Sequence, residues 1–345
     1  MSDQSTLLSI AIPTYNRAEY LRINLEQLEA ETAGKNYPLE ILISDNCSPD
    51  DTQAVVADFI ARGMRIRYIR NRENIGSDHN IAQCFNEAAG KYVVIFGDDD
   101  LFVDGALDRL LRLLGQGQYG VVSLRAYGFD RDFRAERPSC RPRDREYSDA
   151  GAFIAKIGAN ATFISGNVIN KELLPGVDAH NYCGTALVQL SLVYAAALAA
   201  GRNIIVNDYP VACKRNNSGN FIYSQVFAER FWAIVDNFKE RGLDQRSMDK
   251  LARNMLFSYY PFYIFKMRLA SRERYREDYL RFHARFKDNG WFWVTVGPIF
   301  TLPRPLAIIW GAIIVVLGRS MTGDACRGLS FARNLVVRKL GLDNK

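Results

Sequence analysis

Short apolar runs alternate with helical patterns over the first 125 residues. Strands are predicted at residues 7–13, 39–44, 65–70, 92–96 and 120–124. Helices are predicted between them, at residues 17–32, 51–62, 77–89 and 105–114. Short buried strands separated by such helices are typical of a mostly parallel sheet covered on both faces. The pattern therefore predicts a Rossmann-like α/β layer, in which ligands bind beyond the carboxyl ends of the strands.

Residues 126–215 continue this layer less regularly. Residues 126–147 are polar and rich in arginine, which predicts a surface excursion. Ser148 and Asp149 are suited to cap a helix that reaches about Gly158, and residues 161–169 predict a strand. Residues 187–200 are almost wholly apolar, but about 14 residues are too few to span a bilayer, so we expect a buried helix.

Helical patterns rich in aromatic and basic residues dominate the last third of the chain. Two of them cover residues 222–241 and 246–288, and the most apolar part of the chain follows at 291–318. Prolines at 298, 303 and 305 interrupt this part, and residues 324–340 form the pattern of a basic amphipathic helix. We expect association with a membrane surface; a buried helical subdomain or an oligomer interface is the alternative.

Charge divides the chain into an acidic front and a basic rear. Residues 1–213 hold 21 Lys/Arg and 27 Asp/Glu, a balance of −6, and residues 214–345 hold 23 and 11, a balance of +12. The basic residues of the rear are interleaved with long apolar runs, which favours anionic lipid over nucleic acid as the partner.

The six cysteines form no CxxC pair and indicate reduced thiols. The N-terminal residues lack the pattern of a signal peptide.

Three consecutive carboxylates provide the strongest chemical signal. Asp98, Asp99 and Asp100 follow Gly97 directly after the predicted strand at 92–96. Carboxylates crowded at the end of a buried strand repel one another, and a bound cation removes that cost. Oxygen ligands of this kind suit Mg²⁺ or Mn²⁺, which also bind substrate phosphates. A solvated acidic turn is the alternative.

Three weaker signals lie at neighbouring strand ends. Asp45 ends the strand at 39–44 and is suited to bind a ribose or a base edge, although a simple helix cap explains it equally well. The loop at 13–17 offers an aromatic ring and an amide for a flat base, or is a plain turn. The polar turn at 74–80 either lines the same cleft or caps a helix.

The glycines Gly115, Gly117 and Gly120 match the dinucleotide-binding pattern G-x-G-x-x-G in spacing only. They follow a predicted helix and precede a predicted strand, whereas that fingerprint requires the opposite order. We interpret them as the end of a helix and a turn.

Taken together, the chain resembles the family 2 glycosyltransferases, which have the GT-A fold. The matching segments are SIAIPTYNR at 9–17, ILISDNCSPD at 41–50, ENIGSDHN at 73–80 and YVVIFGDDDLF at 92–102. The resemblance covers residues 7–125 well and 126–215 loosely. The GDDD run is most similar to enzymes of the abequosyltransferase type, which add deoxysugars to bacterial O-antigen or capsule repeats.

The resemblance implies roles for the residues in these segments. Asp98 and Asp100 would hold Mn²⁺ or Mg²⁺ against the donor diphosphate, with Asp98 also on the ribose side, and Asp99 would contact the nucleotide sugar. Asp45 would bind the base or ribose. The other implied contacts of the nucleotide sugar are Pro13, Thr14, Tyr15, Asn16, Arg17, Asn74, Gly76, Asn80, Lys214 and Arg215.

Inversion by direct attack, the reaction of the family, needs a base that takes the acceptor's proton. The family supplies an Asp just ahead of a helix in the acceptor half, but the corresponding stretch, residues 181–189, has no carboxylate. Asp178 is the preferred substitute and His180 the second; an ordinary surface loop explains both. Lys214 and Arg215 would close over the diphosphate or form a solvated pair.

The sequence thus predicts a GT-A catalytic domain at residues 1–215, with a nucleotide half at 1–125 and an acceptor half at 126–215. Residues 216–345 would be a helical region associated with the cytoplasmic leaflet of the inner membrane, peripheral or monotopic. The predicted acceptor is a polyprenyl-diphosphate-linked oligosaccharide. The alternatives are a polyprenyl-phosphate glycosyltransferase and a non-catalytic subunit that binds nucleotide sugars.

Overall fold

The structure, a computed structural model, describes residues 6–139, 142–215, 221–269 and 275–322. The chain forms two compact units. Unit 1 consists of Met1–Arg137, Arg141–Phe153 and Asn160–Gly219, and unit 2 of Pro138–Cys140, Ile154–Ala159 and Asn220–Lys345. The predicted helix at 324–340, Cys140 and Cys326 lie outside the described residues.

Unit 1 is built on one mixed sheet with the strand order β3-β2-β1-β4-β8-β6-β9-β5, and β7 pairs with β9. The strands β1, β2, β3 and β4 pair in parallel, as do β6 and β9, whereas β5, β7 and β8 run antiparallel to their neighbours. The strands are β1 (Leu8–Thr14), β2 (Leu39–Asp45), β3 (Ile66–Arg70), β4 (Tyr92–Ile95), β5 (Asp100–Phe102), β6 (Val121–Phe129), β7 (Arg145–Tyr147), β8 (Asn167–Asn170) and β9 (Asn203–Lys214).

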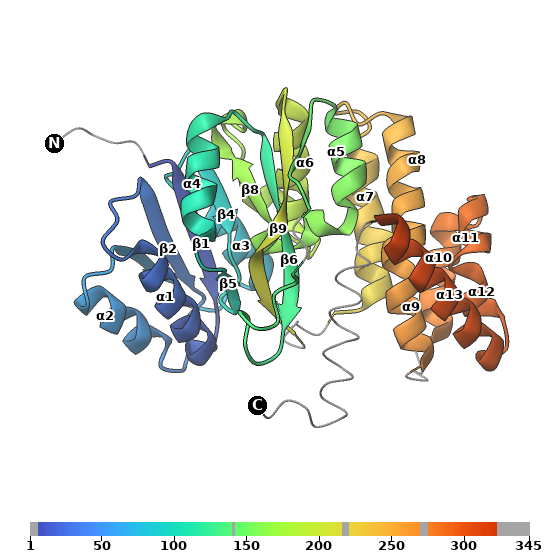
Figure 1. Ribbon diagram of the computed structural model, residues 1–345, viewed down its shortest axis with the longest axis horizontal. Coiled ribbons are helices and arrows are strands. Elements are labelled where there is room, and N and C mark those ends of the chain that lie inside the picture. Colours follow the sequence, from blue (N-terminus) through green and yellow to red (C-terminus); the bar gives the residue numbers. More distant parts are fainter. Residues whose placement is uncertain (1–5, 140–141, 216–220, 270–274, 323–345) are drawn as a thin grey trace. The chain divides into compact units, whose positions relative to one another are not determined.

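Helices cover both faces of this sheet, as the sequence predicts (Figure 1). On one face lie α1 (Ala18–Thr32), α2 (Thr52–Ala61) and α4 (Ala106–Gln116), and on the other α3 (Ser77–Glu87) and α6 (Val188–Ala199). The strands β1 and β4 are buried along almost their whole length because helices pack on both sides of them. The apolar helix α6 is buried, as expected from its composition.

Residues 161–169 differ from the predicted strand. Only β8 is extended; the chain before it forms the short 3-10 helices η1 (Gly158–Thr162) and η2 (Ile164–Gly166). The Asn167 side-chain amide donates to the carbonyl oxygens of Asn160 (2.9 Å) and Phe163 (3.0 Å), which stabilises these turns in place of a strand ladder. The strand β5 is a second difference, because no strand is predicted at residues 100–102. Its first residue, Asp100, belongs to the acidic run, which has no strand pattern.

Unit 2 is helical in the described ranges, which agrees with the pattern of its sequence. Its helices are α7 (Phe231–Asn237), α8 (Gln245–Asn254), α9 (Tyr260–Leu269), α10 (Tyr275–Phe286), α11 (Gly290–Val294), α12 (Gly297–Thr301) and α13 (Arg304–Thr322), with π-helical turns η5 (Gln225–Arg230) and η6 (Met255–Tyr259). Buried aromatic rings form its core, where the Trp232 indole donates to Tyr260 Oη at 2.8 Å. No helix within the described ranges is both long and apolar enough to cross a bilayer.

The three glycines that imitate a dinucleotide fingerprint lie where the helix α4 ends and β6 begins. Gly117 follows α4, and its amide donates to Leu113 O. Gly120 lies against α6, where an added Cβ would overlap the Ala196 carbonyl oxygen and approach Ala200 Cβ to 2.5 Å. These glycines therefore serve packing and helix termination, as the sequence order predicts.

We expect Gly120→Ala to lower the free energy of unfolding by about 1–3 kcal/mol, because the new methyl group has no space between β6 and α6. Gly115→Ala is the matched control: no atom lies within 4 Å of its added Cβ, and alanine favours the helical backbone there. Urea denaturation measures both; equal stability of the two variants would contradict this packing.

Candidate functional site

The loops that follow β1 and β4 meet at the carboxyl edge of the sheet because these two strands are hydrogen-bonded neighbours. Thr14, the last residue of β1, donates its hydroxyl to Asp98 Oδ2 at 2.8 Å. The guanidinium of Arg17 lies between two carboxylates, 3.3 Å from Asp98 Oδ1 and 2.8 Å from Asp99 Oδ2. The structure thus brings together predicted residues that are more than 80 positions apart.

Asp100 lies in a different environment from its two neighbours. It is the first residue of β5, and its carboxylate accepts a hydrogen bond from the Ser165 hydroxyl. Ser165 Oγ also accepts from the Gly97 amide at 2.8 Å, and the Asn24 amide donates to Asp100 O at 2.7 Å. An added Cβ on Gly97 would lie 2.9 Å from the Asp100 carboxylate, so a glycine allows this tight turn.

Burial makes ionisation of this cluster unfavourable. Asp98 and Asp100 expose only 3% and 4% of their surface. Burial raises the pKa of Asp98 to about 7; Arg17 opposes this shift and the Asp99 charge adds to it. Burial also raises the pKa of Asp100 well above its usual range, and the neighbouring carboxylates add to the effect. Without a cation, the buried carboxyl groups of the site therefore retain protons, because Arg17 alone does not stabilise three ionised carboxylates.

The carboxylate oxygens of this cluster fit a hard divalent cation that also binds water and substrate phosphates. Across the residues that the structure describes, no three His, Cys, Asp or Glu side chains gather closely enough to hold a metal by themselves. Mg²⁺ in phosphate-binding enzymes is commonly held by one or two carboxylates, and waters and substrate phosphates complete its coordination. Asp99 is the most accessible of the three, with 15% of its side chain exposed.

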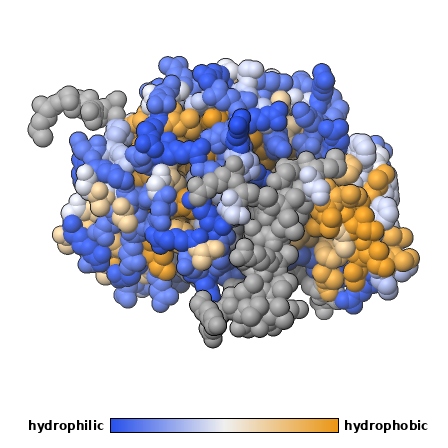
Figure 2. All heavy atoms as spheres, viewed as in Figure 1, coloured by the Kyte–Doolittle hydropathy of each residue, from blue (hydrophilic) through white to orange (hydrophobic). Residues whose placement is uncertain are grey.

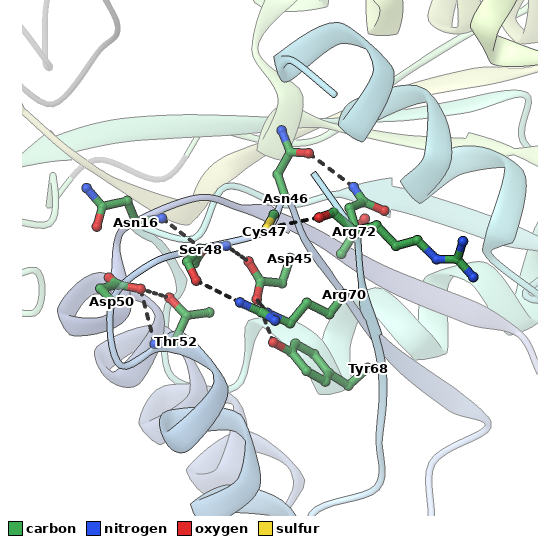
Figure 3. Close-up of polar contacts among 12 residues, drawn as sticks. Asn16, Asp45, Asn46, Cys47, Ser48, Asp50, Thr52, Tyr68, Arg70 and Arg72 are labelled. Carbon is green, nitrogen blue, oxygen red and sulfur yellow. Dashed lines mark hydrogen bonds and ion pairs between the residues drawn. The ribbon is translucent and has the colours of Figure 1, made fainter. Parts of the chain in front are cut away.

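Asp45 ends β2 one strand further along the same edge and is fully buried (Figure 3). Its carboxylate accepts from the Ser48 amide (2.8 Å) and the Tyr68 hydroxyl (2.6 Å), and lies 3.4 Å from Arg70 Nε. Both Tyr68 and Arg70 come from β3. Asp45 thus fixes the position of the Arg70 guanidinium, whose side chain is 42% exposed at this edge. Tyr68 and Arg70 are not among the site residues that the sequence predicts, because a strand pattern of period two does not indicate which side chains reach a site.

The polar turn at 74–80 is fastened to the end of β2. Asn46 donates to Asn74 Oδ1 at 2.8 Å and accepts from the Ile75 amide at 3.0 Å. Asn80 accepts from Ser44 Oγ at 2.6 Å and donates to Ser44 O at 3.0 Å. Gly76 adopts φ +84° just before α3. Asn46 and Asn80 are buried, so in this structure they shape the edge, whereas Asn74 is exposed.

Two residues other than glycine adopt the left-handed backbone conformation at this edge. Asn16 (φ 55°) follows β1, and Cys47 (φ 64°) follows β2. The Asn16 amide donates to Ser48 Oγ at 2.9 Å and thereby joins the two loops (Figure 3). Such strained positions cluster at functional sites. Next to them Tyr15 is 43% exposed, while Pro13 lies within β1.

The two candidate bases lie along α3, toward the opposite edge of the sheet. Asp178 Oδ1 accepts from Asn86 Nδ2 (2.6 Å) and lies 2.9 Å from His180 Nδ1. Asn86 is in the last turn of α3, which leads to the amino end of β4. The same segment then runs back along the helix, because Asp78 in the first turn accepts from the Gly184 and Ala186 amides at 2.8 and 2.9 Å. The structure thus brings Asp178 and His180 together, but not to the aspartate cluster.

Lys214 and Arg215 contact acidic and carbonyl groups at the end of β9. Lys214 Nζ donates to Asp130 O at 2.5 Å, and Arg215 Nη1 lies 2.8 Å from Asp130 Oδ2 and 3.0 Å from Glu136 Oε2. Contact of these atoms with a donor diphosphate would therefore require the Lys214 hydrogen bond and the Arg215 ion pairs to rearrange.

The comparisons with known proteins agree with this fold. Residues 9–174 match the family model Glycosyl transferase family 2. Abequosyltransferase RfbV of Salmonella typhimurium is 28% identical over 228 residues, which cover 62% of this chain and 68% of RfbV. The GalNAc(5)-diNAcBac-PP-undecaprenol beta-1,3-glucosyltransferase of Campylobacter jejuni is 32% identical over 111 residues, 32% of this chain and 35% of that enzyme.

Solved structures support the same fold. S. aureus TarS 1-349 in complex with UDP-GlcNAc aligns with a TM-score of 0.62 at 14% identity, over 93% of this chain and 92% of TarS 1-349. The mannosyltransferase PcManGT from Pyrobaculum calidifontis, in complex with GDP-Man and Mn²⁺, gives 0.51 at 16% identity, over 95% of this chain and 86% of that one. The chain carries a glycosyl transferase family 2 domain of the GT-A fold.

The raised pKa of Asp98 predicts a pH dependence of stability in the metal-free protein. Between about pH 4 and about pH 7 the folded state binds this proton and the unfolded state does not, so stability falls as pH rises through that range. We expect Asp98→Asn to reduce this fall in stability by on the order of 1–3 kcal/mol, while Asp100, whose pKa is also raised, contributes the part that remains. Thermal unfolding of both proteins with chelator, from about pH 5 to about pH 8, measures the difference. An equal slope in both would contradict the assignment.

Proposed function

We propose that the chain is an inverting glycosyltransferase that takes a sugar from a nucleotide-sugar donor bound at the carboxyl edge of β1, β2 and β4. The observation that carries this proposal is the convergence of Thr14, Arg17 and the buried aspartates at that edge. Ligands of α/β sheets bind at this edge, and the family 2 domain covers all of these residues.

The donor's parts correspond to different strand ends. The exposed ring of Tyr15 and the loop around Asn16 are suited to a flat base. Asp45 would act on the base or ribose through Arg70, since its own oxygens already accept from Ser48 and Tyr68. Asn74 and Gly76 border the same edge. The diphosphate would lie near Asp98–Asp100, where Arg17 supplies positive charge.

Asp98 and Asp100 are proposed to hold Mn²⁺ or Mg²⁺ together with the accessible Asp99. A cation there would supply positive charge to the departing nucleoside diphosphate. Arg17 already neutralises part of the cluster and keeps Asp98 and Asp99 oriented. Ser165 holds the Asp100 carboxylate, so binding of a cation by Asp100 would compete with that hydrogen bond. Lys214 and Arg215 are proposed to close over the diphosphate after leaving Asp130.

Asp178 or His180 is the proposed base. Both contact Asn86, so either would need the segment at 178–187 to move toward the aspartates when an acceptor binds. Asp78, which holds that segment at the other end of α3, is a third candidate to test. Loss of transfer at unchanged donor affinity in Asp178→Asn, His180→Gln or Asp78→Asn identifies the base. Full transfer by all three places it elsewhere.

The acceptor is proposed to be a polyprenyl-diphosphate-linked oligosaccharide in bacterial surface polysaccharide assembly, of the O-antigen or capsule kind. The names of the RfbV and Campylobacter relatives support this proposal. A lipid-linked acceptor would place the protein at the cytoplasmic face of the inner membrane, peripheral or monotopic, and the basic balance of +12 in residues 214–345 supports that location.

A non-catalytic role is the second candidate, favoured by the lack of a carboxylate in residues 181–189 and by the position of Asp178. Such a subunit would bind nucleotide sugars without transferring or hydrolysing them. Calorimetry with a panel of donors, followed by a transfer assay, separates the two roles. Product analysis also separates the remaining alternative, because a polyprenyl-phosphate glycosyltransferase makes a sugar linked through one phosphate.

We expect Asp99→Asn to lower transfer at least a hundredfold, a loss of about 2.7 kcal/mol of transition-state stabilisation, and to remove the stimulation by Mn²⁺ or Mg²⁺. The matched control is Asp58→Asn on α2, whose exposed ion pairs contribute little to stability. Initial rates with and without chelator measure the effect. Full transfer in excess chelator would contradict the metal's role, and an equal loss in both variants would contradict the site.

A further inference from the structure

One side of α13 exposes a continuous row of large aliphatic side chains, which we call the α13 stripe. Its members expose between 48% and 64% of their surface. They are Leu306, Ile309, Ile313, Val316 and Leu317. Their spacing of three and four residues places them on one side of the helix. Exposed aliphatic residues are ordinary when single, but a row of five indicates a surface that contacts a partner.

The opposite side of α13 is committed to its own unit. Ala307 and Ile314 are buried, and Gly311 approaches Phe265 so closely that an added Cβ would lie 2.6 Å from the ring. Gly318 approaches the carbonyl oxygen of Phe257 in the same way. Because these contacts attach α13 to α9 and η6, the stripe is a fixed outer surface of unit 2.

Two tryptophans add to the apolar surface of this unit. Trp291 and Trp293 of α11 expose 45% and 43% of their surface. The Trp293 indole nitrogen donates to Lys287 O at 2.8 Å, so its ring is held in place. Figure 2 shows an apolar area over the part of unit 2 that contains α11 to α13. Half-exposed tryptophan is enriched where a protein meets the boundary between lipid and water.

Basic side chains stand at the amino end of the stripe. Arg304 begins α13, and Arg268 donates to Leu302 O at 2.8 Å while its guanidinium lies 4.5 Å from the Tyr275 ring centre. A groove of about 330 Å³ opens beside them, lined by Tyr275, Arg276, Tyr279, Phe300 and Thr301. Among the described residues, neither Arg268, Arg276 nor Arg304 forms an ion pair. Arg276 and Arg304 are exposed, so their charges are available to an anionic group outside the protein, whereas Arg268 is half-buried beside them.

We propose that the α13 stripe and Trp291 and Trp293 enter the outer part of an anionic lipid leaflet, with Arg268, Arg276 and Arg304 at its headgroups. Residues 305–318 contain no charged side chain, so the stripe lacks the charged residues that run beside the apolar seam of a coiled coil. A surface helix of this kind sinks about 5–10 Å into the boundary of headgroups and chains. The proposal rests on the membrane location proposed above, but not on the transfer reaction.

The test is flotation of the full chain with vesicles of phosphatidylethanolamine and phosphatidylglycerol, compared with vesicles of phosphatidylcholine. We expect the wild type to bind the anionic vesicles at least tenfold more strongly, and brominated lipid to quench its tryptophan fluorescence. We expect Ile309→Gln/Ile313→Gln to lose this binding at least tenfold, and Arg276→Gln/Arg304→Gln to lose the preference for anionic lipid. Donor binding, measured by calorimetry, should not change in either variant.

Ile23→Gln is the matched control, because Ile23 on α1 of unit 1 is equally exposed, at 51%, and should not affect binding. Circular dichroism confirms that each variant folds. Three outcomes overturn the proposal: unchanged vesicle binding by Ile309→Gln/Ile313→Gln, no binding by the wild type, or a wild-type dimer that this variant dissociates and that does not float with lipid. None of them depends on whether transfer occurs, so failure of this inference and of the proposed function are distinguishable.

Discussion

The arrangement of unit 1 depends on how three adjacent carboxylates are accommodated at the end of β4. Burial penalises their charge, and each obtains a different compensation: Thr14 and Arg17 for Asp98, Arg17 for Asp99 and Ser165 for Asp100. These partners come from the end of β1, from the loop after it and from the segment before β8. Because Arg17 is a single cation, the compensation stays incomplete, and the pKa of Asp98 and of Asp100 is raised. An incompletely compensated anionic cluster is a place where a divalent cation gains affinity.

Hydrogen bonds from a few buried side chains also hold the neighbouring loops. Asp45 uses its oxygens to hold Ser48, Tyr68 and Arg70, and Asn46 uses both ends of its amide to hold the turn before α3. The buried side chains of Asp45 and Asn46 are therefore hydrogen-bonded to the neighbouring loops, which fixes these loops in place before any ligand binds. What remains accessible is a small set of side chains, among them Tyr15, Arg70 and Asp99. Such preorganisation lowers the cost of ordering loops when a donor binds.

The two units differ in the core that they enclose and in the side chains that they expose. Unit 1 encloses a sheet and presents polar side chains at one edge, whereas unit 2 has an aromatic core and presents aliphatic and basic side chains. The acidic balance of the front and the basic balance of the rear follow the same division of the sequence. A donor that is a soluble anion and an acceptor that is attached to a lipid would require these two kinds of surface in one chain.

The sequence by itself determined the alternation of strands and helices, the acidic run after β4 and the apolar character of α6 and α13, because each is a local pattern of side chains. The order of the predicted helix and strand around Gly115, Gly117 and Gly120 also sufficed to exclude a dinucleotide-binding site there. Tertiary structure decided the rest: that β8 inserts antiparallel between β4 and β6, that Ser165 reaches Asp100, and that Arg70 reaches Asp45. It also placed Asp178 against Asn86 instead of the aspartates. These are contacts between residues 25 to 92 positions apart, and no local spacing encodes which distant strand will become a neighbour.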